Sequence, residues 1–140
     1  MNICDAIPHR PPFLLVDEIV SVEGNTIRTR KRVDPADPVF QGHFPGYPVL
    51  PGVLVCEALA QSGAILIAHL AGDELKGKVP VLTRLHNAKF KQMVRPGDVL
   101  DMEVSLTEKL GGAYFLAGTA RVNGKLAVSA EFACTAVARK

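Results

Sequence analysis

Tryptophan is absent from this 140-residue chain, and aromatic residues make up only 6% of it. Neither sign of charge predominates, since the formal net charge is only +2. A nucleic-acid-binding domain usually carries a strong basic excess. The composition therefore argues against nucleic-acid binding, while the small basic excess would suit an acidic partner protein or an anionic cofactor.

Cysteine is rare, odd in number and scattered, at Cys4, Cys56 and Cys134. This set predicts reduced, partly buried thiols in a cytosolic protein. No Cys/His spacing indicates zinc, and no glycine-rich strand-to-helix turn indicates a nucleotide, so we expect chemistry without a metal or redox cofactor. Residues 1–12 contain no basic region followed by an apolar stretch, which predicts no signal peptide and a cytoplasmic location.

The length and a hydrophobic content of 48% predict a single domain over residues 1–140 with a sizeable core. A short helical turn is expected at residues 2–7. Alternating patterns predict strands over 13–22, 26–33, 79–94, 99–108, 114–122 and 125–137. Asn123-Gly124 predicts a tight hairpin, because a type I′ turn needs positive φ at both positions.

One long apolar segment, Gly52–Leu70, predicts a helix of about five turns that ends at Gly72. A helix that is apolar on nearly every side needs a sheet that curls around it, or a second subunit that covers it. A membrane span is the alternative for such a segment. Glu57 and Gln61 near its middle argue against a span, as do the amphipathic strands on both sides.

The most informative run is residues 41–61, QGHFPGYPVLPGVLVCEALAQ. It places His43 in a loop stiffened by glycine and proline, and Glu57 inside the apolar helix. A fixed imidazole and an acid among hydrophobic side chains make a plausible proton-transfer pair. Gln61 shares a helix face with Glu57, because the two are spaced i, i+4. Gly52, at the expected helix start, could offer a free N–H to a developing oxyanion.

This run resembles the signature of the FabZ family, the 3-hydroxyacyl-acyl-carrier-protein dehydratases of bacterial fatty acid synthesis. HRPPFLLVD at residues 9–17 and VRPGDVL at residues 94–100 resemble two further motifs of that family. The resemblance implies an α+β hotdog fold, in which a curved antiparallel sheet wraps around one long central helix. It also implies a homodimer with continuous sheets and shared active sites, and such dimers often assemble into hexamers as trimers of dimers.

The resemblance further implies a role for each site residue. His43 would take the proton from the α-carbon, and Glu57 of the other subunit would assist loss of the β-hydroxyl as water. The N–H of Gly52 would hold the thioester oxygen, and Gln61 would orient Glu57. The substrate would arrive on the phosphopantetheine of acyl carrier protein, with no other cofactor.

The chain departs from the family pattern at Tyr47 and in the segment 84–86, where Arg-Leu-His replaces a sequence such as Gly-Ile-Asp. A basic group of Arg84, Lys89, Lys91 and Arg95 is either a solvated face or a docking site for the acidic carrier protein. Lys89 and Lys91 are expected on one strand face, opposite Phe90. His9 and His86 receive no role, and His69 suits the negative end of the helix dipole.

Three functional classes remain open. The first is a lyase that removes water from a 3-hydroxyacyl thioester to give the trans-2-enoyl thioester. The second is a thioesterase on the same fold, with a carboxylate that activates water or attacks the thioester. The third is a non-catalytic module that binds acyl thioesters, against which the presence of both His43 and Glu57 counts.

Overall fold

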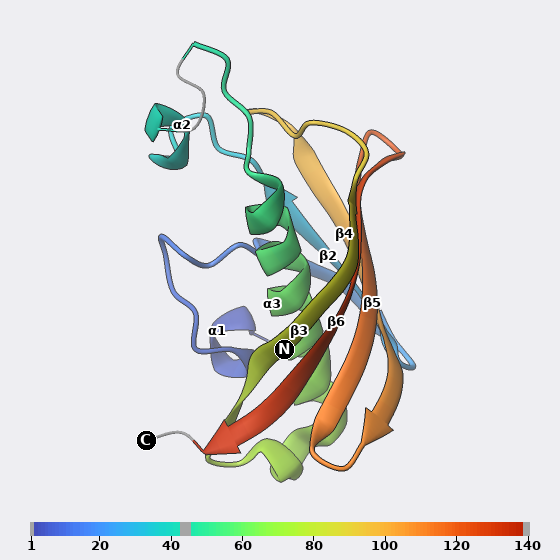
Figure 1. Cartoon of the computed structure of the whole chain (residues 1–140). Helices are drawn as coiled ribbons and strands as arrows, with labels where there is room; N and C mark the ends of the chain where they lie inside the picture. Colours follow the sequence, from blue (N-terminus) through green and yellow to red (C-terminus); the bar gives the residue numbers. More distant parts are fainter. Residues whose placement is uncertain (1, 43–45, 139–140) are drawn as a thin grey trace.

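One long helix packed against one antiparallel sheet makes up most of the molecule (Figure 1). The computed structural model describes residues 2–42 and 46–138. The helices are α1 (Ile3–Ala6), α2 (Val39–Gly42), α3 (Gly52–Ala71) and the 3₁₀ helix η1 (Gly72–Leu75). The strands are β1 (Glu18–Glu23), β2 (Thr26–Arg32), β3 (Lys78–Phe90), β4 (Val99–Leu110), β5 (Ala113–Val122) and β6 (Lys125–Ala138).

The strands form a single sheet in the order β1-β2-β4-β5-β6-β3, with antiparallel neighbours throughout. Shifts of register interrupt β3 between Leu82 and Arg84 and again between His86 and Lys89. Such bulges bend a strand and increase its twist. The sheet consequently curves so that α3 contacts β2, β3, β4, β5 and β6. The expected α+β class, with a curved sheet around one long helix, is confirmed.

Side-chain alternation explains how the sheet meets the helix. On β2 the side chains of Ile27 and Thr29 are buried, whereas those of Arg28, Arg30 and Arg32 are exposed. The period of two places one set on each face of the sheet, as the sequence predicts. The hairpin between β5 and β6 turns at Asn123 and Gly124, which have φ values of 51° and 79°. Positive φ at both positions confirms the expected turn.

Helix α3 supplies the centre of the core. Its residues from Ala58 to Ile67 are all buried, and Leu59, Ile65, Leu66 and Ile67 are 0% exposed. The segment from Gly52 to Leu75 is long and apolar enough to cross a membrane, but 67% of its apolar window is buried inside the fold. The sheet and the N-terminal segment therefore cover the apolar side chains, as expected of a core helix.

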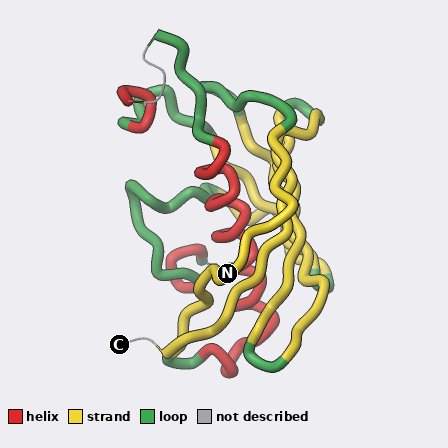
Figure 2. Tube along the Cα trace, viewed as in Figure 1, coloured by secondary structure: helices red, strands yellow, loops and turns green. Residues whose placement is uncertain are grey.

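Several expected boundaries are wrong. The strand expected at residues 13–22 begins only at Glu18, and the one expected at 79–94 ends at Phe90. Val94 instead forms an isolated bridge with Leu50. The connection between β2 and α3 contains the short helix α2. Between α1 and β1 the chain passes along α3 as an irregular segment (Figure 2).

Gly63 allows α3 to approach the sheet closely. A Cβ atom at this position would lie 2.9 Å from Phe132 Cε2 and 3.0 Å from Leu116 Cδ2. We expect Gly63→Val to lower the free energy of unfolding by about 1–3 kcal/mol, because the larger side chain must displace these buried groups. Urea unfolding would measure the change. Gly112→Val is the matched control, since nothing lies within 4 Å of its Cβ position. Equal stability of the two variants would contradict this account of the helix–sheet contact.

Candidate active site

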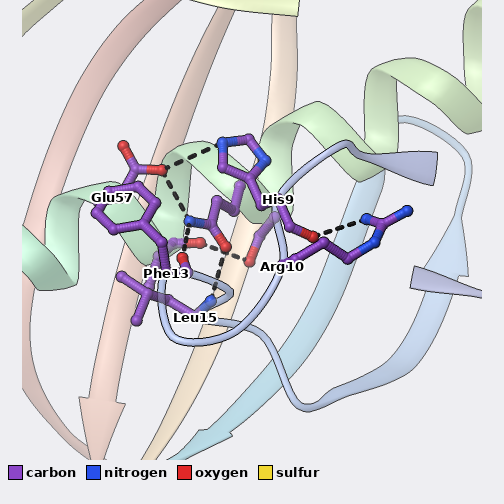
Figure 3. Close-up of polar contacts among 8 residues, drawn as sticks. His9, Arg10, Phe13, Leu15 and Glu57 are labelled. Carbon is purple, nitrogen blue, oxygen red and sulfur yellow. Dashed lines mark hydrogen bonds and ion pairs between the residues drawn. The ribbon is translucent and has the colours of Figure 1, made fainter. Parts of the chain in front are cut away.

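Glu57 and Gln61 lie one turn apart on α3 and are joined by a hydrogen bond, as their spacing predicts. The side-chain Nε2 of Gln61 donates to Glu57 Oε2 at 2.9 Å. Gln61 is 1% exposed, and its amide also bonds the segment before β1. Its Nε2 also donates to the carbonyl oxygen of Phe13 at 2.9 Å, and its Oε1 accepts from the N–H of Leu15 at 2.7 Å. Gln61 therefore fixes both the carboxyl group and the segment beside it (Figure 3).

The Glu57 carboxyl group faces a pocket of about 230 Å³. Its side chain is 24% exposed, so solvent or a ligand can reach it. The pocket is mostly apolar and lies between α3, the N-terminal segment and the strands β3 and β6. The lining residues are Pro8, His9, Glu57, Ala60, Gln61, Ala64, Val79, Pro80, Val81, Leu82 and Cys134. Such walls would suit an apolar ligand such as an acyl chain. Glu57 is the acidic side chain among the lining residues.

His9 is the polar side chain that sequence reasoning missed in this pocket. Its Nε2 lies 3.7 Å from Glu57 Oε2, and its ring stacks on Phe13 with centroids 6.2 Å apart (Figure 3). His9 and Glu57 are 48 positions apart, so no helical or strand period connects them. The signal that could have found it is the motif HRPPFLLVD, whose residues Phe13 and Leu15 are bound by Gln61.

A thiol also lines the pocket. Burial, together with the nearby Glu57 carboxylate, raises the pKa of Cys134 to about 11. Burial likewise raises the pKa of Cys56, which is 5% exposed and packs in the core as expected. A thiol must lose its proton to act as a nucleophile. Cys134 therefore stays neutral near pH 7 and serves as an apolar part of the wall.

Gly52 opens onto a different and larger pocket, of about 620 Å³. As expected, Gly52 is the first residue of α3. Its backbone lies directly under a ring, since a Cβ atom there would be 2.5 Å from Cδ1 and Cε1 of Phe90. Phe90, Lys91 and Met93 line this pocket with residues 49–53. A narrow ligand that reached the start of the helix through this pocket would pass alongside the Phe90 ring.

The expected constellation is thus only partly assembled in one chain. Glu57 and Gln61 are together, whereas Gly52 lines the other pocket. The N–H of Gly52 points out of the start of α3 along the helix axis, whereas the Glu57 side chain projects from the side of the helix five residues further on. His43 lies outside the described residues. Among residues 2–42 and 46–138, no group of three or more His, Cys, Asp or Glu side chains could hold a metal ion.

The four basic residues expected to dock a carrier protein are all exposed. Lys91 does not share a strand face with Lys89, because β3 ends at Phe90. It lines the pocket in front of Gly52 instead. Arg95 is held by Tyr47, whose hydroxyl oxygen accepts from Arg95 Nη2 at 2.6 Å and whose ring lies 5.1 Å from the guanidinium carbon. The unusual Tyr47 thus sets the position of one expected docking residue.

Comparison with known proteins gives concordant results. The FabA-like domain family matches residues 7–131. A curated relative from Clostridium acetobutylicum, a 3-hydroxyacyl-[acyl-carrier-protein] dehydratase FabZ, is 48% identical over 131 residues, which cover 93% of this chain and 92% of the relative.

Solved structures agree on the fold. The dehydratase heterocomplex ApeI:P from Xenorhabdus doucetiae matches with a TM-score of 0.79 and 19% identity, over 96% of this chain and 90% of that one. A hypothetical thioesterase with coenzyme A from Streptococcus pneumoniae matches with a TM-score of 0.67 and 12% identity, over 88% and 90%. At these identities the likeness shows the fold alone, and the fold is the expected hotdog.

Gln61 offers a direct test of how the site is held. We expect Gln61→Leu to lower the free energy of unfolding by about 2–4 kcal/mol, because the N–H of Leu15 and the carbonyl of Phe13 would lose their partner. Urea unfolding followed by circular dichroism would measure the loss. The exposed Gln92 provides the control, since Gln92→Leu should change stability by less than about 0.5 kcal/mol. An equally small effect at Gln61 would contradict the proposed anchoring.

Proposed function

The chain belongs to the FabA-like family and, within it, to the FabZ dehydratases, and from this premise we propose how its residues dehydrate 3-hydroxyacyl-acyl-carrier-protein thioesters. The product is the trans-2-enoyl thioester of fatty acid biosynthesis, and the reaction is reversible. The observation that carries the proposal is the Glu57 carboxyl group, fixed by Gln61 at the wall of an apolar pocket. We further propose that residues 1–140 act as one cytoplasmic dehydratase domain.

The proposed chemistry needs an acid, a base and an oxyanion site. The imidazole of His43 takes a proton from the α-carbon, while the N–H of Gly52 stabilises the charge that develops on the thioester oxygen. Glu57 gives its proton to the β-hydroxyl group, which leaves as water while the double bond forms. A proton returned from His43 to Glu57 through solvent restores the starting state. No metal or cofactor takes part beyond the phosphopantetheine that carries the substrate.

The separation of the two pockets supports a site shared by two subunits. Gly52 and Glu57 line different pockets of one chain, and no described residue lines both. We propose that one substrate meets Gly52 of one chain and Glu57 of another. Strand β3 supports such pairing, because it is an edge strand of 13 residues that flanks the Glu57 pocket. Val81, Leu82 and Leu85 on it are 41–44% exposed. A long, apolar, unpaired edge is a template for pairing with another chain. We propose a homodimer joined at β3, which assembles further into a trimer of dimers.

Acyl carrier protein is the proposed partner that delivers the substrate. Arg84, Lys89, Lys91 and Arg95 are exposed, and their positive charge complements an acidic carrier. Lys91 lies beside the pocket of Gly52, where a phosphopantetheine arm would enter on this proposal.

The alternatives have less support. A thioesterase would use the Glu57 carboxylate to activate water or to attack the thioester, whereas the curated relative that is 48% identical to this chain is a dehydratase. A module that only bound acyl thioesters would have no use for a carboxyl group held at an apolar wall.

A single assay separates these functions. A 3-hydroxyacyl carrier-protein thioester is mixed with the protein, and enoyl absorbance and free thiol are followed together. We expect enoyl formation without thiol release, and at least about a hundredfold slower turnover for His43→Ala and Glu57→Gln. The exposed residues His69 and Glu108 provide controls, since His69→Ala and Glu108→Gln should turn over like the wild type. Thiol release would indicate a hydrolase, and binding without either signal would indicate a sensor.

Mixing the two inactive variants tests the shared site. In a dimer of one His43→Ala chain and one Glu57→Gln chain, one site has lost both groups and the other has both intact. Random exchange of subunits should therefore restore up to about a quarter of wild-type activity. The activity of each variant refolded alone provides the baseline. If no activity returned although mass spectrometry detected the mixed dimers, the acid and the base would have to come from the same chain.

A further inference from the structure

The surroundings of His9 suggest a function beyond packing. Its backbone is fixed by Arg10, whose Nη1 donates to the carbonyl oxygens of Ile7 at 2.8 Å and of His9 at 2.7 Å, and whose Nη2 donates to that of Cys4 at 2.8 Å. Phe13 stacks on the imidazole ring with an interplanar angle of 26°. The backbone of His9 is therefore fixed by Arg10 and its ring is covered by Phe13, with Nε2 directed at the Glu57 carboxyl group (Figure 3).

The other ring nitrogen indicates which tautomer is present. The Nδ1 atom of His9 is buried and finds no hydrogen-bond partner in the described part of the chain. A proton on Nδ1 would be a buried donor without an acceptor, which is unfavourable. A neutral ring with its single proton on Nε2 leaves only a lone pair at Nδ1 and presents an N–H to Glu57.

Two N–H groups thus converge on one oxygen of the acid. Oε2 of Glu57 accepts from Gln61 at 2.9 Å and lies 3.7 Å from His9 Nε2. The second distance is too long for a hydrogen bond, although catalytic contacts are often long before substrate binds. For the other oxygen, Oε1, no partner is recorded among residues 2–42 and 46–138.

Building on the proposed dehydration, we propose that His9 is a positioning residue that acts through Glu57. Its Nε2–H and the Gln61 amide together occupy Oε2, so that the proton of the carboxylic acid resides on Oε1. Oε1 is then the oxygen that donates to the β-hydroxyl group of the substrate. Without His9 the N–H of Gln61 alone holds Oε2, so the carboxyl group is less firmly oriented and fewer encounters with substrate are productive.

Two amide substitutions distinguish this role from simple packing. Glutamine can place an N–H near the position of Nε2, whereas asparagine can reach only that of Nδ1. We expect His9→Gln to retain kcat within about threefold and His9→Asn to lower it about tenfold, with KM little changed in both. In a Glu57→Gln background, His9→Asn should cause no further loss, because the group through which it acts is gone. Thermal unfolding of each variant reports on any change in stability.

The outcomes separate this proposal from the proposed function. If His9→Asn turns over like the wild type, or lowers kcat equally with and without Glu57, the positioning role is wrong while the dehydration stands. Equal losses in His9→Gln and His9→Asn, with lowered melting temperatures, would indicate a packing role and also overturn it. A wild-type protein that forms no enoyl thioester would overturn the proposed function itself, and this proposal with it.

Discussion

The buried amide of Gln61 is the contact on which the site depends. It joins α3 to the N-terminal segment through the backbone of Phe13 and Leu15, and with the same nitrogen it holds Glu57. A buried amide is tolerated only when its donors and its acceptor are satisfied. The segment and the acid are therefore positioned by one group. This coupling explains why an irregular stretch of chain, rather than a strand or a helix, forms one wall of the pocket.

The same amide explains where sequence reasoning succeeded and failed. Helix α3, the alternation on β2 and the turn at Asn123-Gly124 were predictable, because each follows from a local period or a local backbone requirement. The contact between Glu57 and Gln61 was also predictable, because the two residues lie one helical turn apart. The strand expected from Phe13 was wrong, because apolar alternation cannot reveal that the backbone there bonds a side chain. The approach of His9 to Glu57 depends on that tertiary contact, and no local pattern encodes it.

The edge strand β3 links the fold to the site. Its exposed apolar side chains need a cover, and its residues Val79 to Leu82 form a wall of the Glu57 pocket. Any chain that paired with this edge would therefore lie next to the acid. The bulges in β3 bend the strand around α3, so the curvature that buries the helix also shapes this wall. Core packing, access to the carboxyl group and the pairing that we propose thus involve the same strand.

The chemistry of the pocket, like the exposed edge of β3, is consistent with the second chain that we propose. Its described titratable side chains are Glu57, His9 and Cys134. Cys134 is held neutral by its raised pKa, and on our proposal the proton of His9 is committed to Glu57. The wall thus offers one carboxyl group, whereas elimination of water from a thioester needs both an acid and a base. Gly52, which we propose as the oxyanion site, lines the other pocket and is separated from Glu57 in the same way. A neighbouring copy that brought His43 and Gly52 to this pocket would supply both missing groups at once.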